Sequence, residues 1–124
     1  MKVAVIGSRG LKVSHLENYL PQTTTEIVSG GAQGIDTCAR EHAIMSGLGI
    51  IEFLPDYGRY GRRAPLLRNE RIVQYADLVL AFWDGSSRGT KFVIDYCKKQ
   101  GVPVLIYQST GNGKYILLDS YGAR

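Results

Sequence analysis

The sequence predicts an α/β fold: a doubly wound parallel sheet of at least five strands in the order 3-2-1-4-5, with helices on both faces. Short runs of β-branched and other apolar residues alternate along the chain with segments of helical periodicity. The first and fourth of these runs are apolar throughout, as expected of central strands buried on both faces. Glycine-rich segments follow three of the runs, where a strand would turn into a helix.

Five segments are predicted as strands. Residues 3–6 and 78–83 are the most uniformly apolar and suit the centre of the sheet. The remaining strands are residues 26–29, 50–54 and 103–107. Beyond them, Gly111-Asn112-Gly113 is typical of a turn, so residues 115–118 are a candidate for a further strand.

Four helices are expected between the strands. Apolar residues recur at three- and four-residue steps in residues 35–45, 66–73 and 92–97, which gives each segment one face to pack against the sheet. Pro65 suits the first turn of the second of these helices. A shorter helix is expected around residues 16–20, before Pro21.

Length and composition predict one domain over residues 1–124, with a core at about 2–107 and a C-terminal extension at 108–124. Of the 124 residues, 44% are hydrophobic and 21% are charged, close to the values of ordinary globular domains. No run approaches the about 18 apolar residues of a membrane span, and Met1-Lys2 leads straight into a strand. We therefore expect neither a membrane segment nor a secretory signal, and a cytoplasmic location.

The two cysteines, Cys38 and Cys97, fall within predicted helices. No cysteine and histidine spacing typical of a metal site surrounds them, so they are expected to be buried free thiols in a reducing compartment. We expect no metal and no cofactor.

Three of the predicted loops between strand and helix, residues 7–10, 29–36 and 84–90, are rich in glycine, serine and arginine. Right-handed crossovers bring all such loops to one edge of a parallel sheet, where ligands of doubly wound folds bind. Glycine allows close approach of the backbone to a phosphate, helix N-termini attract anions, and arginine forks match phosphate oxygens. The net charge of +4 also favours an anionic ligand. The alternative is that the loops are tight turns with serine caps.

The candidate ligand-binding residues in these loops are Gly7, Ser8, Arg9, Ser29, Gly30, Gly31, Gly34, Asp36, Asp84, Gly85, Ser86, Ser87, Arg88, Gly89 and Thr90.

The segment SGGAQGID at 29–36 closely resembles the SGxAxGID signature of the DNA-processing protein DprA. The order GSRG, SGGAQGID, RN and DGSSRGT resembles the small YspA-type members of the SLOG superfamily, which also holds DprA and the LOG phosphoribohydrolases. The resemblance covers about residues 2–107. It implies a Rossmann-like sheet that binds nucleotides or nucleotide-derived ligands, often as a homodimer. It also adds Arg68 and Asn69 to the candidate site, where LOG enzymes carry Arg-Lys.

The sequence departs from the LOG pattern at two positions. Val93 stands three residues after Thr90, where LOG enzymes carry their catalytic glutamate, and Asn69 replaces their lysine. A valine side chain can neither stabilise an oxocarbenium-like centre nor move a proton, so the LOG mechanism cannot be inherited intact. Asp36 and Asp84 are the remaining carboxylates near the predicted site.

Residues 56–63 interleave tyrosine with arginine, a mixture that stacks bases and holds phosphates in single-strand binders. The alternative is a mobile, solvated loop that acts as a lid over the pocket.

The function favoured by the sequence is binding of a nucleotide or nucleotide-derived phosphorylated small molecule, as a sensor or partner module. Two alternatives stay open. One is hydrolysis of a nucleoside monophosphate by an N-glycosidase or phosphoribohydrolase, which the missing glutamate disfavours. The other is binding of single-stranded nucleic acid, which the DprA-like motif and the charge favour, although the basic residues form no continuous stripe.

Overall fold

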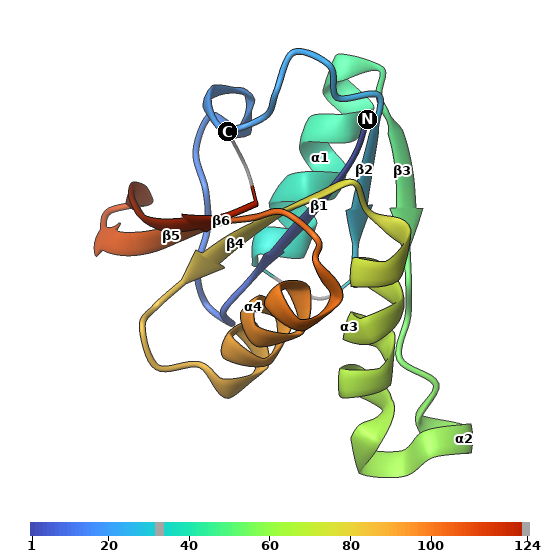
Figure 1. Ribbon diagram of the computed structural model, residues 1–124. Helices are drawn as coiled ribbons and strands as arrows, with labels where there is room; N and C mark the ends of the chain where they lie inside the picture. The colour runs from blue at the N-terminus through green and yellow to red at the C-terminus, as the bar shows by residue number, and fades with distance from the viewer. Residues whose placement is uncertain (32–33, 123–124) are drawn as a thin grey trace.

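A six-stranded sheet lies at the centre of the computed structural model, which describes residues 1–31 and 34–122 (Figure 1). Its strands are β1 (Lys2–Gly7), β2 (Glu26–Ser29), β3 (Gly49–Glu52), β4 (Leu78–Trp83), β5 (Val104–Gly111) and β6 (Lys114–Tyr121). They lie in the order β3-β2-β1-β4-β5-β6; the first five are parallel, and β6 pairs antiparallel with β5. The predicted order of five strands is confirmed, and the segment after the 111–113 turn adds the sixth.

Three of the four predicted helices are confirmed as α1 (Ile35–Ser46), α3 (Ala64–Tyr75) and α4 (Arg88–Gln100). In α4, the Ser87 hydroxyl accepts a hydrogen bond from the Thr90 N–H and caps the first turn. Within the described residues, no helix is both long and apolar enough to cross a membrane.

The helix expected around residues 16–20 is wrong in kind, because only the single 3-10 turn η1 (Leu16–Asn18) forms there. His15 enters the turn with φ 58°, and Pro21 follows soon after it. The few residues between them cannot offset the cost of nucleating an α-helix. Leu16 is nevertheless buried, so the segment still contributes to the core.

The segment rich in tyrosine and arginine forms a short α-helical turn, α2 (Tyr57–Tyr60), followed by the 3-10 turn η2 (Gly61–Arg63). Asp56 caps α2, since its side chain accepts a hydrogen bond from the Arg59 N–H at 3.1 Å. In Figure 1, α2 projects from the end of α3 beyond the sheet.

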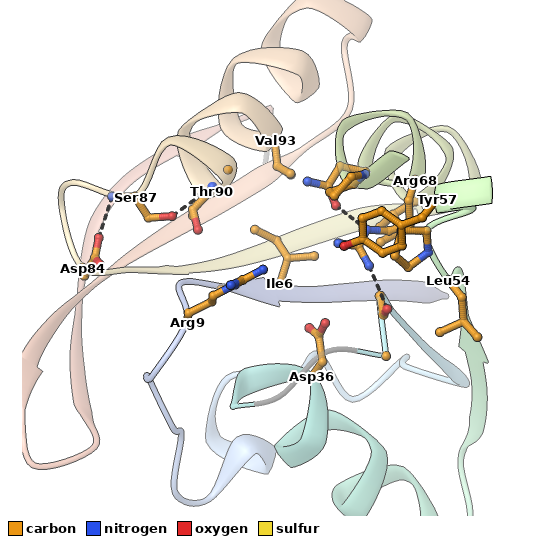
Figure 2. Close-up of a pocket in the computed structure, with 18 residues that line it drawn as sticks. Ile6, Arg9, Asp36, Leu54, Tyr57, Arg68, Asp84, Ser87, Thr90 and Val93 are labelled. Atoms are coloured by element: carbon orange, nitrogen blue, oxygen red, sulfur yellow. Dashed lines mark hydrogen bonds between the residues drawn. The ribbon is translucent and has the colours of Figure 1, made fainter. Parts of the chain in front are cut away.

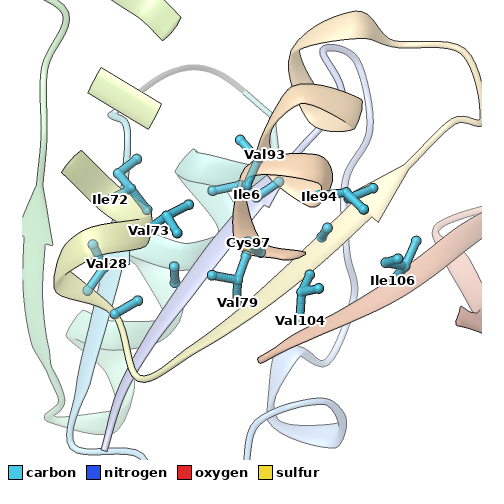
Figure 3. Packing of buried hydrophobic residues seen from close by; sticks show 13 residues of the cluster. Ile6, Val28, Ile72, Val73, Val79, Val93, Ile94, Cys97, Val104 and Ile106 are labelled. Carbon is cyan, nitrogen blue, oxygen red and sulfur yellow. The ribbon is translucent and has the colours of Figure 1, made fainter. Parts of the chain in front are cut away.

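Two apolar layers enclose the sheet. On one face, α3 and α4 pack through residues such as Ile72, Val93 and Cys97 (Figure 3). On the other face, α1 packs through Ile35 and Ala39. Helices therefore cover both faces, as predicted, and the direction of winding reverses between β1 and β4. Such a reversal opens a crevice at the carboxyl ends of the strands.

Both cysteines are free thiols. Cys97 is fully buried, and this burial raises the pKa of its thiol to about 12. Cys38 is only partly buried. The expectation of buried thiols is therefore confirmed for Cys97 alone.

An aromatic cluster joins the hairpin of β5 and β6 to the rest of the molecule. Phe82 stacks on Tyr107 with ring centroids 5.3 Å apart, and Tyr115 meets Phe82 edge-on at 4.9 Å. The Tyr115 hydroxyl donates a hydrogen bond to the Lys12 carbonyl oxygen at 2.7 Å. This contact ties the hairpin to the loop that follows β1.

We expect Tyr115→Phe to lower the free energy of unfolding by about 0.5–1.5 kcal/mol near neutral pH, because the Lys12 carbonyl loses its donor. Desolvation raises the pKa of Tyr115 to about 12, above its value of about 10 in an unfolded chain. The stability that this proton supplies is complete below about pH 10 and is lost as the pH rises towards 12.

Urea denaturation across this alkaline range tests the prediction. The wild type should lose more stability than Tyr115→Phe, so the difference between the two proteins should narrow. Tyr107 and Cys97 also have raised pKa values, but they are present in both proteins and affect both equally. If the free energies of unfolding of the two proteins fall in parallel as the pH rises, the prediction is wrong.

Candidate functional site

A cavity of about 520 Å³ opens at the carboxyl ends of β1, β2 and β4, where the winding reverses (Figure 2). This volume lies in the range of small-molecule sites. Most of the predicted site residues line it: Gly7, Arg9, Gly30, Gly31, Asp36, Arg68, Asn69, Asp84, Ser87, Gly89 and Thr90. The three glycine-rich loops and the start of α3 therefore meet around one space.

Six predicted residues do not line the cavity: Ser8, Ser29, Gly34, Gly85, Ser86 and Arg88. Ser8 is buried behind the wall, where its hydroxyl lies 3.2 Å from the Thr90 hydroxyl and accepts the Asp84 N–H at 3.2 Å. Arg88 is exposed at the first position of α4. The sequence predicted ligand contacts for all six, and the structure does not test them; because Arg88 does not line the cavity, we no longer expect it to contact a ligand held there. Ala32 and Gln33 of the SGGAQGID motif lie outside the described residues.

Sequence patterns did not predict most of the apolar wall, which consists of Ile6, Leu54, Pro55, Pro65 and Ile72. Val93, at the position of the LOG glutamate, and Tyr57, in the segment considered as a lid, also line the cavity. Ile6 lies near the carboxyl end of β1, and Leu54 lies just beyond the carboxyl end of β3. This position at the ligand-binding edge of the sheet was the one feature of the sequence that could have predicted them as wall residues. An apolar residue at a strand end otherwise predicts only core.

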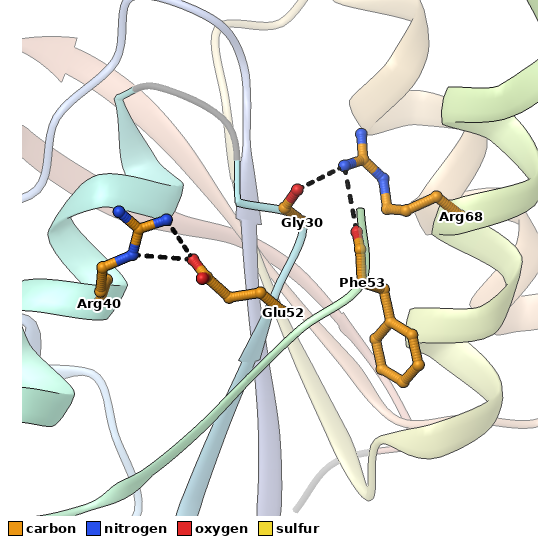
Figure 4. Close-up of polar contacts among 5 residues, drawn as sticks. All are labelled: Gly30, Arg40, Glu52, Phe53 and Arg68. Atoms are coloured by element: carbon orange, nitrogen blue, oxygen red, sulfur yellow. Dashed lines mark hydrogen bonds and ion pairs between the residues drawn. The ribbon is translucent and has the colours of Figure 1, made fainter. Parts of the chain in front are cut away.

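Arg68 fastens the loops after β2 and β3 to α3 (Figure 4). Its Nη1 donates to the Gly30 carbonyl at 2.8 Å and makes a longer contact of 3.5 Å to the Phe53 carbonyl. Its Nε donates to the Asn69 Oδ1 at 2.8 Å. A Cβ at Gly30 would overlap the guanidinium, so this approach requires glycine. Desolvation lowers the pKa of Arg68, and Asp36 and Tyr57 oppose the shift; the group stays charged at neutral pH.

Asp84 organises the loop between β4 and α4. Its Oδ1 accepts the backbone N–H groups of Ser86 at 2.9 Å and Ser87 at 2.8 Å. These two bonds lower the pKa of Asp84 below its usual value. The carboxyl is therefore ionised and engaged at neutral pH, which suits a turn residue and not a proton donor.

Arg9 and Asp36 supply the other charges of the cavity. Arg9 is exposed and forms no ion pair or hydrogen bond with another described residue. Asp36 is 8% exposed and lies in the first turn of α1, with its carboxylate directed into the cavity in Figure 2. Arg9 thus offers a planar set of donors to an anion.

Val93 forms part of the wall and is 2% exposed. The carboxylates among the lining residues are Asp36 and Asp84. In the part of the chain that the structure describes, no three His, Cys, Asp or Glu side chains gather in a way that could hold a metal ion. The position that carries a glutamate in LOG enzymes is therefore an apolar surface here.

Residues 1–62 match the family model of DNA recombination-mediator protein A, which is half of the chain. The chain belongs to this family. The match supports the relation to DprA and the SLOG superfamily that the motifs indicated. Its range takes in the loops after β1 and β2 and the wall residues Leu54, Pro55 and Tyr57, and it ends before α3.

Two kinds of relatives are similar to this member of the DNA recombination-mediator protein A family. Gene 61 protein of Mycobacterium phage D29 is 35% identical over 85 residues, which are 64% of this chain and 68% of that protein. Translation initiation factor IF-2 of Xanthomonas campestris pv. campestris (strain 8004) is 32% identical over 104 residues, or 84% of this chain. The chain spans only 11% of the length of that factor.

Replacing two glycines of the cavity wall, Gly7 and Gly89, by alanine should have different effects on the free energy of unfolding. A Cβ at Gly7 would lie 2.5 Å from the Ile35 Cγ1 and 2.8 Å from the Phe82 carbonyl oxygen, so Gly7→Ala should lower the free energy of unfolding by about 1–3 kcal/mol. At Gly89 in α4, a Cβ would meet no heavy atom within 4 Å. Gly89→Ala should therefore be neutral or stabilising by up to about 1 kcal/mol. Urea denaturation measures both, and equal midpoints would refute the predicted packing of β1 against α1.

Proposed function

We propose that this cavity binds a nucleotide or a nucleotide-derived phosphorylated ligand, and that the protein acts as a sensor or partner module without chemistry. The observation that carries the proposal is one cavity with two different ends. Arg9 and the start of α4, with Gly89 and Thr90, border it on one side, and Tyr57 and Leu54 border it on the other (Figure 2).

In this proposal the phosphate lies beside Arg9 and the N-terminus of α4. Guanidinium donors and a helix start both favour an anion. The base lies against Tyr57 and Leu54, because an aromatic ring and an apolar surface match its flat face. Asp36, between these two ends, accepts hydrogen bonds from sugar hydroxyls. The order of the four motifs around one cavity supports membership of the YspA type within the SLOG superfamily.

Nucleic acid is the second candidate ligand. The match to the DNA recombination-mediator protein A family supports a nucleic-acid-related role. Arg59, Arg62 and Arg63 are exposed in and beside α2, next to the proposed base end. The homodimer and the cytoplasmic location stay predictions; light scattering tests the first.

Replacing Arg9 should weaken binding of AMP. We expect Arg9→Gln to raise the dissociation constant about ten- to a hundredfold, because a charge-assisted contact to the phosphate is lost. Arg88→Gln removes the same charge one residue before Gly89 but outside the cavity wall, and it should change the affinity little. Isothermal titration calorimetry measures both. If the Arg88 variant loses more affinity than the Arg9 variant, the phosphate lies outside the cavity.

The purified protein should release little or no free base from AMP. The apolar Val93 leaves no carboxylate at the position of the LOG glutamate, and the Oδ1 atom of Asp84 accepts N–H groups of its own loop. Chromatography of the reaction mixture detects free adenine. Base release that disappears in Asp84→Asn or Asp36→Asn would promote the phosphoribohydrolase alternative.

A further inference from the structure

A second cavity of about 290 Å³ lies beside the first, between α2 and the outer side of α3. The two cavities share Leu54 and Arg68. Leu54 is 65% exposed, so this shared wall is accessible to solvent. A ligand that occupies the first cavity and extends past Leu54 enters the second.

The single turn of α2 divides its two tyrosines between the cavities. Tyr57 lines the first, and Tyr60 lines the second. Residues three apart lie on the same side of a helical turn, so both rings border one continuous path. Both are exposed, at 57% for Tyr57 and 43% for Tyr60, and a flat group can reach each of them.

The charges of the second cavity exclude a phosphate as its main occupant. Asp56 and Glu70 oppose Arg68 and Arg71, so the wall carries no excess of positive charge. The Glu70 carboxylate forms no hydrogen bond or ion pair with another described residue and can accept N–H groups. A neutral, flat ring with N–H donors on its edge matches this wall.

Arg68 lies on the wall that the two cavities share, and one nitrogen of its guanidinium, Nη2, is available to a ligand. Nη1 and Nε donate to Gly30 and Asn69, whereas Nη2 donates to no described residue. A phosphate that links two nucleosides across Leu54 would lie within reach of this group.

We infer that the second cavity is a nucleobase subsite and that the ligand carries two nucleosides joined through phosphate. The inference rests on the proposed function of the first cavity. Tyr60 and Glu70 are its specificity-determining residues: the ring stacks on the second base, and the carboxylate accepts from its edge.

Calorimetry of the full chain with AMP and with the 5′-phosphorylated dinucleotide pApA tests the inference. Because its second base stacks on Tyr60, pApA should bind at least about tenfold more tightly than AMP. Tyr60→Ala and Glu70→Gln lower the affinity for pApA towards that of AMP and leave AMP unchanged. Tyr121→Ala, an exposed tyrosine on β6 that lines neither cavity, is the matched control and changes neither affinity.

The outcomes distinguish failure of the second subsite from failure of the proposed function of the first cavity. Equal binding of AMP and pApA, or an equal loss of both ligands in Tyr60→Ala, overturns the second subsite and leaves the first cavity a mononucleotide site. Failure of both ligands to bind overturns the proposed function and the subsite together. A five-nucleotide strand distinguishes the source of the two bases: affinity equal to that of pApA indicates a dinucleotide. If the five-nucleotide strand binds more tightly than pApA, and the slope of log affinity against log salt concentration changes by about −0.7 for each added phosphate, the ligand is the end of a single strand.

Discussion

The parallel pairing of β1 with β4 brings together loops that are far apart in the chain. The Ser8 N–H donates to the Phe82 carbonyl at 3.0 Å, and the Ser8 hydroxyl lies 3.2 Å from that of Thr90, 82 residues later. Because Ser8 also accepts the Asp84 N–H, the loop after β1 and the start of α4 hold each other in place. These contacts hold together the two loops that carry Arg9 and Asp84, two of the charged residues of the cavity.

The two arginines of the cavity, Arg9 and Arg68, and the nearby Arg40 have different physical roles. Arg68 is partly buried and donates from Nη1 to the Gly30 carbonyl and from Nε to Asn69, so it fixes the shape of the wall. Arg9 is exposed and uncommitted among the described residues. Arg40, on the other face of the sheet, binds Glu52 at 2.7 Å and supports the end of β3 (Figure 4). An anion therefore meets a wall that is already rigid, which lowers the entropic cost of binding.

Sequence patterns predicted the strands and long helices because apolar periodicity depends on which face is buried. They could not separate Arg9 from Arg88, since both follow a strand in a glycine-rich loop and only the direction of each side chain decides which faces the cavity. Ile6 and Val93 were equally ambiguous, because the core and the cavity wall demand the same apolar character. The single turn η1 formed in place of the expected helix because the segment between His15, which is left-handed, and Pro21 is too short for an α-helix.

An apolar wall at Val93 has consequences for what the site can do. Cleavage of a glycosidic bond develops positive charge on the sugar, and a nearby carboxylate stabilises that charge. Here the acidic residue that follows β4, Asp84, is held ionised by two N–H donors of its own loop, and Asp36 lies at the start of α1. Both carboxylates border the cavity, but neither stands at the position that Val93 occupies, where LOG enzymes carry their catalytic glutamate. An apolar wall at that position stabilises a bound ligand and a transition state to the same extent, and such uniform binding gives affinity without rate acceleration. This is the physical reason for our proposal that the cavity binds its ligand without chemistry.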